Sequence, residues 1–220
     1  FARLIRFGLP GGVHIFLDVL GCAFFLGMVG RLSQTELAAS SMVVAVGDLI
    51  FMPLVGFHIG LSTLAGNALG RRDPRQAARY TARTMEIALL YLVLVISACL
   101  IWPDPLLGLF RERGITDAQF QIVRATAIRP LYFLAAHLLL HGIAFIYIGT
   151  LKGAGDTLFI MWATLILSLG VLVLPSYLVV EYVHAGHLAL WALFVVYSLC
   201  FVLVIWRRYA SGRWRDIRLI

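Results

Sequence analysis

The order of apolar and polar residues divides the chain into six long apolar stretches, separated by short polar connections. Each stretch approaches or exceeds the roughly 20 residues that a helix needs to cross a bilayer. Apolar positions run on without alternating with polar ones, which favours helices over barrel strands. We expect helices at about 7–30, 37–69, 84–103, 128–151, 157–180 and 186–206. The pattern predicts an all-α integral membrane protein, a six-transmembrane-helix bundle formed by one domain, residues 1–220.

Composition and charge support a membrane protein and argue against a nucleic-acid partner. Of the 220 residues, 61% are hydrophobic and 13% are charged, whereas about 25% are charged in a typical globular domain. The net charge is +7, but the basic residues flank the apolar stretches and form no single patch with interleaved aromatics. If the N-terminus is cytoplasmic, 13 of the 18 Lys and Arg residues lie on the inside, in line with the positive-inside rule. We therefore expect both termini in the cytoplasm.

Two basic segments are expected at the cytoplasmic surface, a loop at 71–83 and a C-terminal tail at 207–220. In the loop, Arg75, Arg79 and Arg83 recur at every fourth residue, so one face of a helix there would be basic. Such a face could rest against anionic headgroups of the bilayer or act only as a topology anchor. The spacing leaves both readings open.

Asp18 is the single formal charge in the first apolar stretch and lies near its middle, between Arg6 and Arg31. A carboxylate at this depth costs about 2.5–3.5 kcal/mol even by translocon insertion. An ionisable residue inside a membrane span is by default a functional-site hypothesis. His14 lies four residues earlier, on the same helix face, and Asp48 in the second stretch is a further acidic candidate.

His137 and His141 in the fourth stretch also share a helix face, because they are four residues apart. A zinc site is disfavoured, since it normally needs three or four protein ligands and no Cys or Glu stands at a matching spacing. The pair could titrate in a cavity, because histidine changes charge near physiological pH. Alternatively, both rings are packed and bonded to carbonyl groups. His58 is interpreted as a hydrogen-bonded packing residue.

Other motifs are local. Ser33 and Glu36 have the spacing of a capping box, and Gly56 to Gly60 is one of two GxxxG patterns, the other being Gly66 to Gly70. The glycine-rich turn at 152–157 lacks the order of a phosphate-binding loop. No catalytic motif stands out, so we expect neither an enzyme nor a cofactor. The three cysteines are read as small buried apolar residues: Cys22, Cys99 and Cys200.

Several stretches, in this order and spacing, resemble the multidrug and toxic compound extrusion (MATE) family. They are 6–10 (RFGLP) with 16–20 (FLDVL), 29–32 (VGRL) with 36–39 (ELAA), 66–70 (GNALG) with Asp73, Ala77 and Ala78, and 149–157 (GTLKGAGDT). The resemblance implies twelve helices in two six-helix lobes. This chain is similar to the second lobe, helices seven to twelve, so the partner would be the N-terminal lobe. The first residue is Phe rather than Met, which also suggests a piece of a longer protein.

The resemblance further implies export of organic cations or drugs by antiport with protons or sodium, in a bacterial inner membrane. Asp18 matches a position, usually Glu, that helps to coordinate the coupling cation. His141 falls where the sodium-coupled branch carries Asp, and His137 falls one turn earlier, where that branch often has Tyr. These departures favour protons over sodium, because histidine carries protons well and binds sodium poorly. His14 and His141 could modulate Asp18 or relay its proton.

Two other functions stay open at this point. One is a flippase for lipid-linked oligosaccharides with a related fold, although Arg residues at the span ends do not suit a pyrophosphate cavity. The other is a membrane module that transports nothing by itself and needs a partner lobe.

Overall fold

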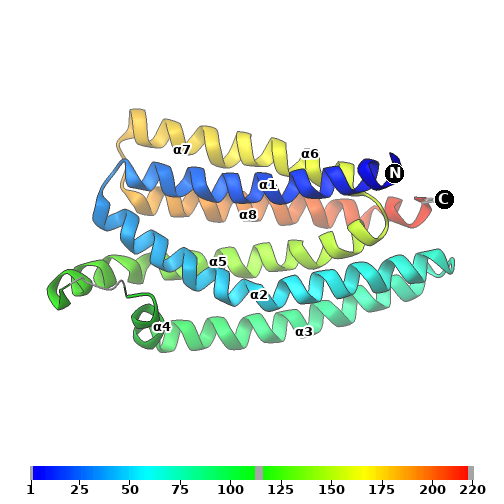
Figure 1. Cartoon of the computed structure of the whole chain (residues 1–220), viewed down its shortest axis with the longest axis horizontal. Coiled ribbons are helices and arrows are strands. Elements are labelled where there is room, and N and C mark those ends of the chain that lie inside the picture. Colours follow the sequence, from blue (N-terminus) through cyan, green and yellow to red (C-terminus); the bar gives the residue numbers. More distant parts are fainter. Residues whose placement is uncertain (1, 112–115, 218–220) are drawn as a thin grey trace.

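A computed structural model describes residues 2–111 and 116–217 of the chain. The regular elements in these residues are helical (Figure 1). The end of the expected tail, 218–220, and the connecting residues 112–115 lie outside the described residues. The elements are α1 (Ala2–Gly30), α2 (Gln34–Gly70), α3 (Pro74–Ile101), α4 (Pro103–Leu109), α5 (Asp117–Gly153), α6 (Thr157–Leu167), the π-helix η1 (Ser168–Val173), α7 (Leu174–Leu178), the π-helix η2 (Val179–Val183), α8 (His187–Ala210) and the 3₁₀ turn η3 (Arg213–Asp216).

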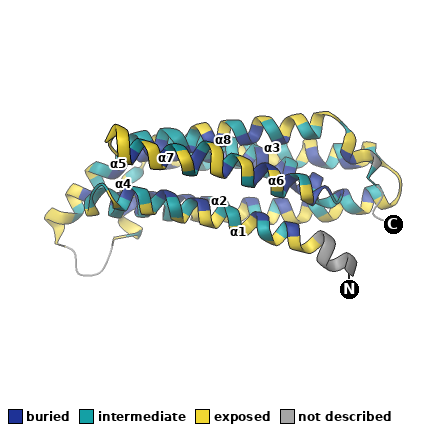
Figure 2. Cartoon of the chain, turned by 90° about the horizontal axis from the view of Figure 1, so that it is seen from above, coloured by how far each residue is buried: buried dark blue, intermediate teal, exposed yellow. Residues whose placement is uncertain are grey.

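Within the described residues, six segments are long and apolar enough to cross a membrane: α1, α2, α3, α5, the continuous run from α6 to η2, and α8. They pack as an elongated bundle, and both ends of the chain lie at the same end of it (Figure 1). We call this the terminal end. Helix α5 is central, because it packs against α2, α3 and α8. Buried residues face the inside of the bundle and exposed apolar ones cover its outside (Figure 2).

The most extensive helix contact, between α2 and α5, includes close backbone approaches at glycines. A Cβ atom at Gly149 would lie 3.0 Å from the carbonyl oxygen of His58, and one at Gly66 would lie 3.2 Å from that of Gly153. Small residues allow such close approach of two backbones in membrane helices. Of the two GxxxG patterns in α2, only Gly66 takes part in this contact. Gly56, Gly60 and Gly70 face open space.

The helices are longer than the apolar stretches that predict them. The expected loop 71–83 is helical from Pro74, and the expected helix 84–103 becomes α3, which ends at Ile101. Asp73 caps α3 by accepting a hydrogen bond from the Gln76 amide at 2.9 Å. Likewise α5 begins at Asp117 rather than at 128, behind a capping box formed by Thr116 and Gln119.

The extra length has a physical reason. An α-helix of 37 residues, the length of α2 and of α5, is about 55 Å long, whereas the hydrocarbon core is about 30 Å thick. Hydropathy detects only the part that suits hydrocarbon, while the helical hydrogen-bond ladder continues into the polar zone. The basic residues of 74–83 are therefore the first turns of a long span.

The predicted capping box at the start of α2 is half formed. Ser33 is the N-cap, and its hydroxyl accepts from the Thr35 amide at 3.2 Å. Glu36 does not return the bond. Its carboxylate instead pairs with His187 Nδ1 at 2.8 Å and ties α2 to the start of α8.

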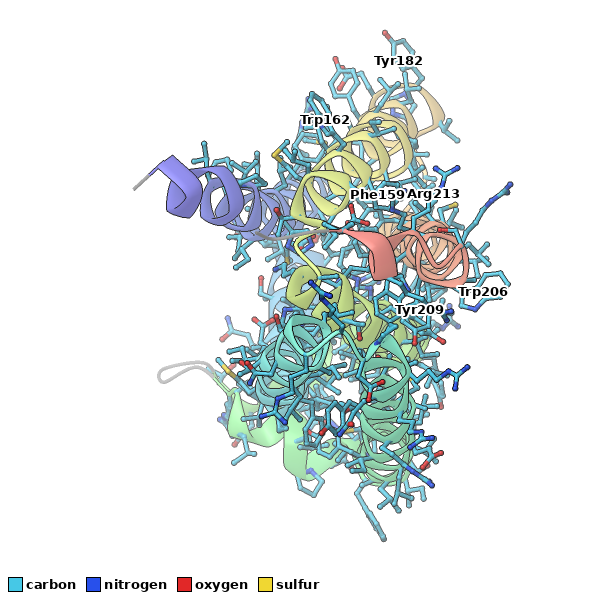
Figure 3. All side chains as sticks on the ribbon, turned by 90° about the vertical axis from the view of Figure 1, so that its right-hand side faces the viewer. Phe159, Trp162, Tyr182, Trp206, Tyr209 and Arg213 are labelled. Carbon is cyan, nitrogen blue, oxygen red and sulfur yellow. The ribbon has the colours of Figure 1, made fainter. Side chains whose placement is uncertain are left out.

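The fifth span runs to Val183, beyond the predicted end at 180, and two π-helical segments flank Pro175 in it. Proline has no amide proton and its ring clashes with the preceding turn, so the regular ladder is interrupted there. Trp162 and Tyr182 of this span point away from the bundle (Figure 3).

The end of the chain folds back onto the bundle. Trp214 in η3 is fully buried, and its Nε1 donates to the carbonyl of Tyr209 at 2.9 Å. Nearby, Arg208 of α8 makes two hydrogen bonds of 2.6 and 3.1 Å with Asp156, at the turn between α5 and α6. Tyr209 and Arg213 lie at the terminal end of the bundle (Figure 3). The Arg208 guanidinium carbon lies 4.7 Å from the centroid of the Phe159 ring of α6. At least 213–216 of the predicted tail thus belong to the packed fold.

Candidate ion-coupling and substrate site

Asp18 lies midway along α1 with 26% of its side chain exposed. His14 lies one turn before it and is almost fully buried. His14 Nε2 is 3.5 Å from Asp18 Oδ2, which is longer than an ordinary hydrogen bond. Neither ring nitrogen of His14 has a hydrogen-bond partner. Buried polar atoms are rarely left unpaired, and such an atom calls for an explanation.

Two residues from other helices complete the surroundings of Asp18. Tyr197 of α8 is buried, and its hydroxyl lies near enough to the Asp18 carboxylate to interact with it. Lys152, near the end of α5, is close enough to interact with Asp18 as an opposite charge. It also interacts electrostatically with His14. The groups that act on Asp18 are therefore one hydroxyl, one ammonium group and one imidazole.

Neither Tyr197 nor Lys152 was singled out in the sequence. Tyr197 is one of eight tyrosines and lies in an apolar stretch, and Lys152 fits the charge pattern of a topology marker. Lysine side chains lean toward the N-terminus of their helix, so a lysine in the last turn of α5 can reach back along the bundle. That lean is the one local signal that could have suggested it.

His137 and His141 stack on one another with ring centroids 5.1 Å apart. His137 Nδ1 is 2.6 Å from the hydroxyl of Ser198, and that hydroxyl donates to the carbonyl of Phe194 at 2.9 Å. Because a hydroxyl carries a single proton, Nδ1 of His137 must be the donor in this pair. His137 is therefore a packed, hydrogen-bonded ring, although its partner is a hydroxyl and not the expected carbonyl.

His141 is in a different situation. Its ring stacks against Phe201, with centroids 5.4 Å apart, and lies 5.7 Å from the ring of Phe51. Its Nδ1 is buried and has no hydrogen-bond partner. It interacts electrostatically with His14. Of the predicted histidine pair, His141 is thus the member with an unused ring nitrogen near the Asp18 site.

His58 was expected to be a packing residue, and its contacts agree with that interpretation. Its Nδ1 donates to the carbonyl of Phe145 at 2.9 Å, and its ring stacks on the Phe145 ring at 4.2 Å. It also lies near enough to His14 to interact with it electrostatically.

Asp48 is not among the groups that interact directly with Asp18. Its side chain is exposed on α2. The neighbouring titratable group is the thiol of Cys22 on α1. Cys22 lies one turn after Asp18 on α1, and a role for Asp48 as a second acid of the site stays a prediction.

Among the described residues, no three His, Cys, Asp or Glu side chains are arranged to hold a metal ion. Two residues of the glycine-rich turn at 152–157 interact with other helices. Its Asp156 binds Arg208, and its Lys152 interacts electrostatically with Asp18.

The chain is similar in sequence to known membrane proteins. The "Probable multidrug resistance protein NorM" of Xanthomonas axonopodis pv. citri is 30% identical over 157 residues, which are 70% of this chain and 32% of that protein. Human "Multidrug and toxin extrusion protein 1" is 26% identical over 71% of this chain and 26% of its own length. The chain thus spans about a third or less of these relatives.

A solved structure described as the outward-facing conformation of a multidrug resistance MATE family transporter has the same fold. Its TM-score is 0.82 at 17% identity, and the match covers 94% of this chain and 46% of that one. The model of the MatE family matches residues 10–178. The six-helix membrane bundle described above therefore belongs to the MatE family, a family of transporters and not of enzymes.

Proposed function

We propose that this chain is one lobe of a secondary antiporter that exports organic cations in exchange for protons, with Asp18 as the coupling carboxylate. The observation that carries the proposal is the setting of Asp18. It lies in the middle of a membrane span, partly exposed, and faces His14, Tyr197 and Lys152. The names of the relatives, multidrug resistance and extrusion proteins, support the substrate class.

The physics of a carboxylate in a poorly solvated site gives the mechanism. Two opposite charges 4 Å apart attract by about 4 kcal/mol at an effective dielectric constant of about 20, against about 1 kcal/mol in water. Ionised Asp18 thus holds a cation, and protonation of Asp18 releases it. A proton entering from one side of the membrane and a cation leaving from the other can therefore compete for the same carboxylate.

The neighbours of Asp18 favour a proton over a sodium ion. Hard metal cations prefer several oxygen ligands, and Tyr197 is the one neighbouring side chain identified here that offers an oxygen. Lys152 adds a positive charge that repels a metal ion. His14, whose ring nitrogens are unpaired, can take up or pass on a proton. The unpaired Nδ1 of His141 is a further place for that proton.

The rest of the proposed transporter follows from the length of the chain. The six helices cover 46% of a solved MATE transporter, so we infer that an N-terminal lobe of the same protein completes the substrate path. In this proposal the protein lies in the bacterial inner membrane, and the terminal end of the bundle faces the cytoplasm.

The test uses the full-length transporter, reconstituted in liposomes, with ethidium efflux measured under a pH gradient and, separately, under a sodium gradient. We expect efflux driven by the pH gradient alone. Asp18→Asn should lower its rate at least tenfold, whereas Asp18→Glu, which restores the carboxylate, should recover much of it. The matched control is Asp117→Asn, since the Asp117 side chain is 89% exposed at the start of α5. Unchanged efflux and pH dependence in Asp18→Asn would show that Asp18 is not the coupling residue. Efflux driven by a sodium gradient alone would show that the coupling ion is sodium and not the proton.

A further inference from the structure

Asp48 is the only formal charge between Glu36 and Arg71, and it lies within the membrane-crossing helix α2. Its side chain is exposed. Within the described part of the chain it takes part in no ion pair or hydrogen bond. An exposed, unpaired carboxylate cannot face hydrocarbon without a large free-energy penalty, and such residues almost always face a bundle interior or a water-filled cavity. The Asp48 face of α2 is therefore turned toward water or another part of the transporter.

Helix α3 shows by contrast what a lipid-facing surface of this bundle looks like. Its exposed large apolar residues include Ile87, Leu90, Val93 and Leu94, which are 55–62% exposed. No charged residue occurs in α3 between Glu86 and its end at Ile101. The exposed face of α2 thus carries a carboxylate and that of α3 in its apolar part does not, so the two faces suit different surroundings.

The residues that share a face with Asp48 suit a bulky organic cation. Met52, Gly56 and Gly60 follow at intervals of four, and all four residues are exposed, so they lie on one side of the helix within an arc of about 120°. Met52 is 69% exposed, and a methionine side chain adapts to ligands of different shape. The two glycines have open space in front of them and leave room for an aromatic ring system.

We propose that Asp48, Met52, Gly56 and Gly60 form a contact strip for lipophilic organic cations, on the side of α2 that meets the other lobe. The carboxylate selects for positive charge, the methionine supplies adaptable apolar contact, and the glycines supply space. Asp18, in contrast, is partly buried and already faces Tyr197 and Lys152. The two acids therefore divide the work: Asp48 contacts the substrate and Asp18 couples transport to the ion.

This inference rests on the proposed function but is tested separately, by equilibrium binding. Tetraphenylphosphonium, a permanently charged lipophilic cation, is titrated into the purified full-length transporter. Asp48→Asn should raise its Kd about tenfold, as loss of a contact to a charged group typically does. Asp48→Glu should restore the affinity, which excludes misfolding as the cause, and Asp117→Asn is the matched control. In efflux assays, Asp48→Asn should raise KM and leave the pH profile unchanged.

A second measurement tests where the strip lies. Met52→Cys should react with a membrane-impermeant, charged thiol reagent beyond the background of the unsubstituted protein, and tetraphenylphosphonium should slow the reaction. Leu90→Cys, on the exposed face of α3, should stay unreactive.

The outcomes separate the two proposals. Saturable binding that depends on Asp48, without efflux driven by a pH gradient, would overturn the proposed function and leave the strip standing. An unchanged Kd in Asp48→Asn, no saturable binding by the parent protein, or an unreactive Met52→Cys would each overturn the strip.

Discussion

Replacing Gly153 by alanine tests the closest helix contact of the bundle. A Cβ atom at this position would meet the backbone oxygen of Ser62 nearer than real Cβ atoms approach any atom, and it would lie 3.1 Å from the amide nitrogen of Gly66. Both obstacles are backbone atoms of α2, so no side-chain rotation can relieve the overlap. Helices α2 and α5 must move apart.

The magnitude follows from the contacts that are lost. A separation of about 1 Å forfeits up to half of the attraction of each atom pair, and each pair contributes about 0.1–0.2 kcal/mol. For roughly 30 atom pairs at the crossing, the loss is about 2 kcal/mol, within the range of about 1–3 kcal/mol seen for overpacked cores. In the full-length transporter, about twice as long as this chain, that corresponds to a lower melting temperature by about 2–4 °C, because the entropy of unfolding grows with chain length.

The assay is thermal unfolding of the purified full-length transporter in detergent, followed by circular dichroism. Two further glycines calibrate the result. Gly142→Ala meets the tip of the Leu92 side chain at 2.7 Å, which can rotate away, so a smaller loss is expected. A Cβ atom at Gly108 in α4 would have nothing within 4 Å. Gly108→Ala should therefore melt at the temperature of the parent, or be more stable by up to about 1 kcal/mol. The reasoning is refuted if Gly153→Ala melts within 1 °C of Gly108→Ala.

Two other predictions concern the terminal end of the bundle. Trp214→Ala should weaken the packing of η3 by about 3–5 kcal/mol, because the lost side chain is fully buried, and trypsin should then cleave faster after Arg213. The control is Trp206→Ala, which removes a side chain that is 51% exposed and should change the cleavage rate little. Equal cleavage rates in the two variants would contradict the predicted packing of Trp214. Asp156→Asn should destabilise the transporter by roughly 2–4 kcal/mol, because Arg208 loses a largely buried partner that accepts two hydrogen bonds. If the two residues act as a pair, adding Arg208→Gln should not lower the melting temperature further. Additive losses of stability in the double variant would argue against the pair.

Much of the fold follows from the sequence, because membrane crossing depends on local properties. A stretch of apolar residues of sufficient length must satisfy its backbone hydrogen bonds internally, so it forms a helix wherever it lies. All six spans could be predicted in this way, and so could the position of Asp18 midway along the first. The true ends of the helices could not, because α3 and α5 continue into polar turns that hydropathy does not recognise.

The surroundings of Asp18 were decided by the tertiary structure. Its neighbours Lys152 and Tyr197 are more than 130 residues away in the sequence, and their contact depends on how α5 and α8 are rotated and how they cross α1. In a water-soluble protein, the single apolar face of a helix shows which side of it packs against the core. In a membrane helix, the core-facing and lipid-facing sides are both apolar, so this signal is weak.

The same reason explains the two acids and the two histidines. Asp18 and Asp48 are equivalent in the sequence, each a single carboxylate in an apolar helix, and only the packed bundle leaves one partly buried and the other exposed. His137 and His141 share a helix face, but Ser198 from α8 satisfies one and leaves the other with an unpaired nitrogen. The sequence alone determined which residues lie within the membrane, and the tertiary structure decided which of them meet, because helix rotation and crossing are set by contacts between distant segments.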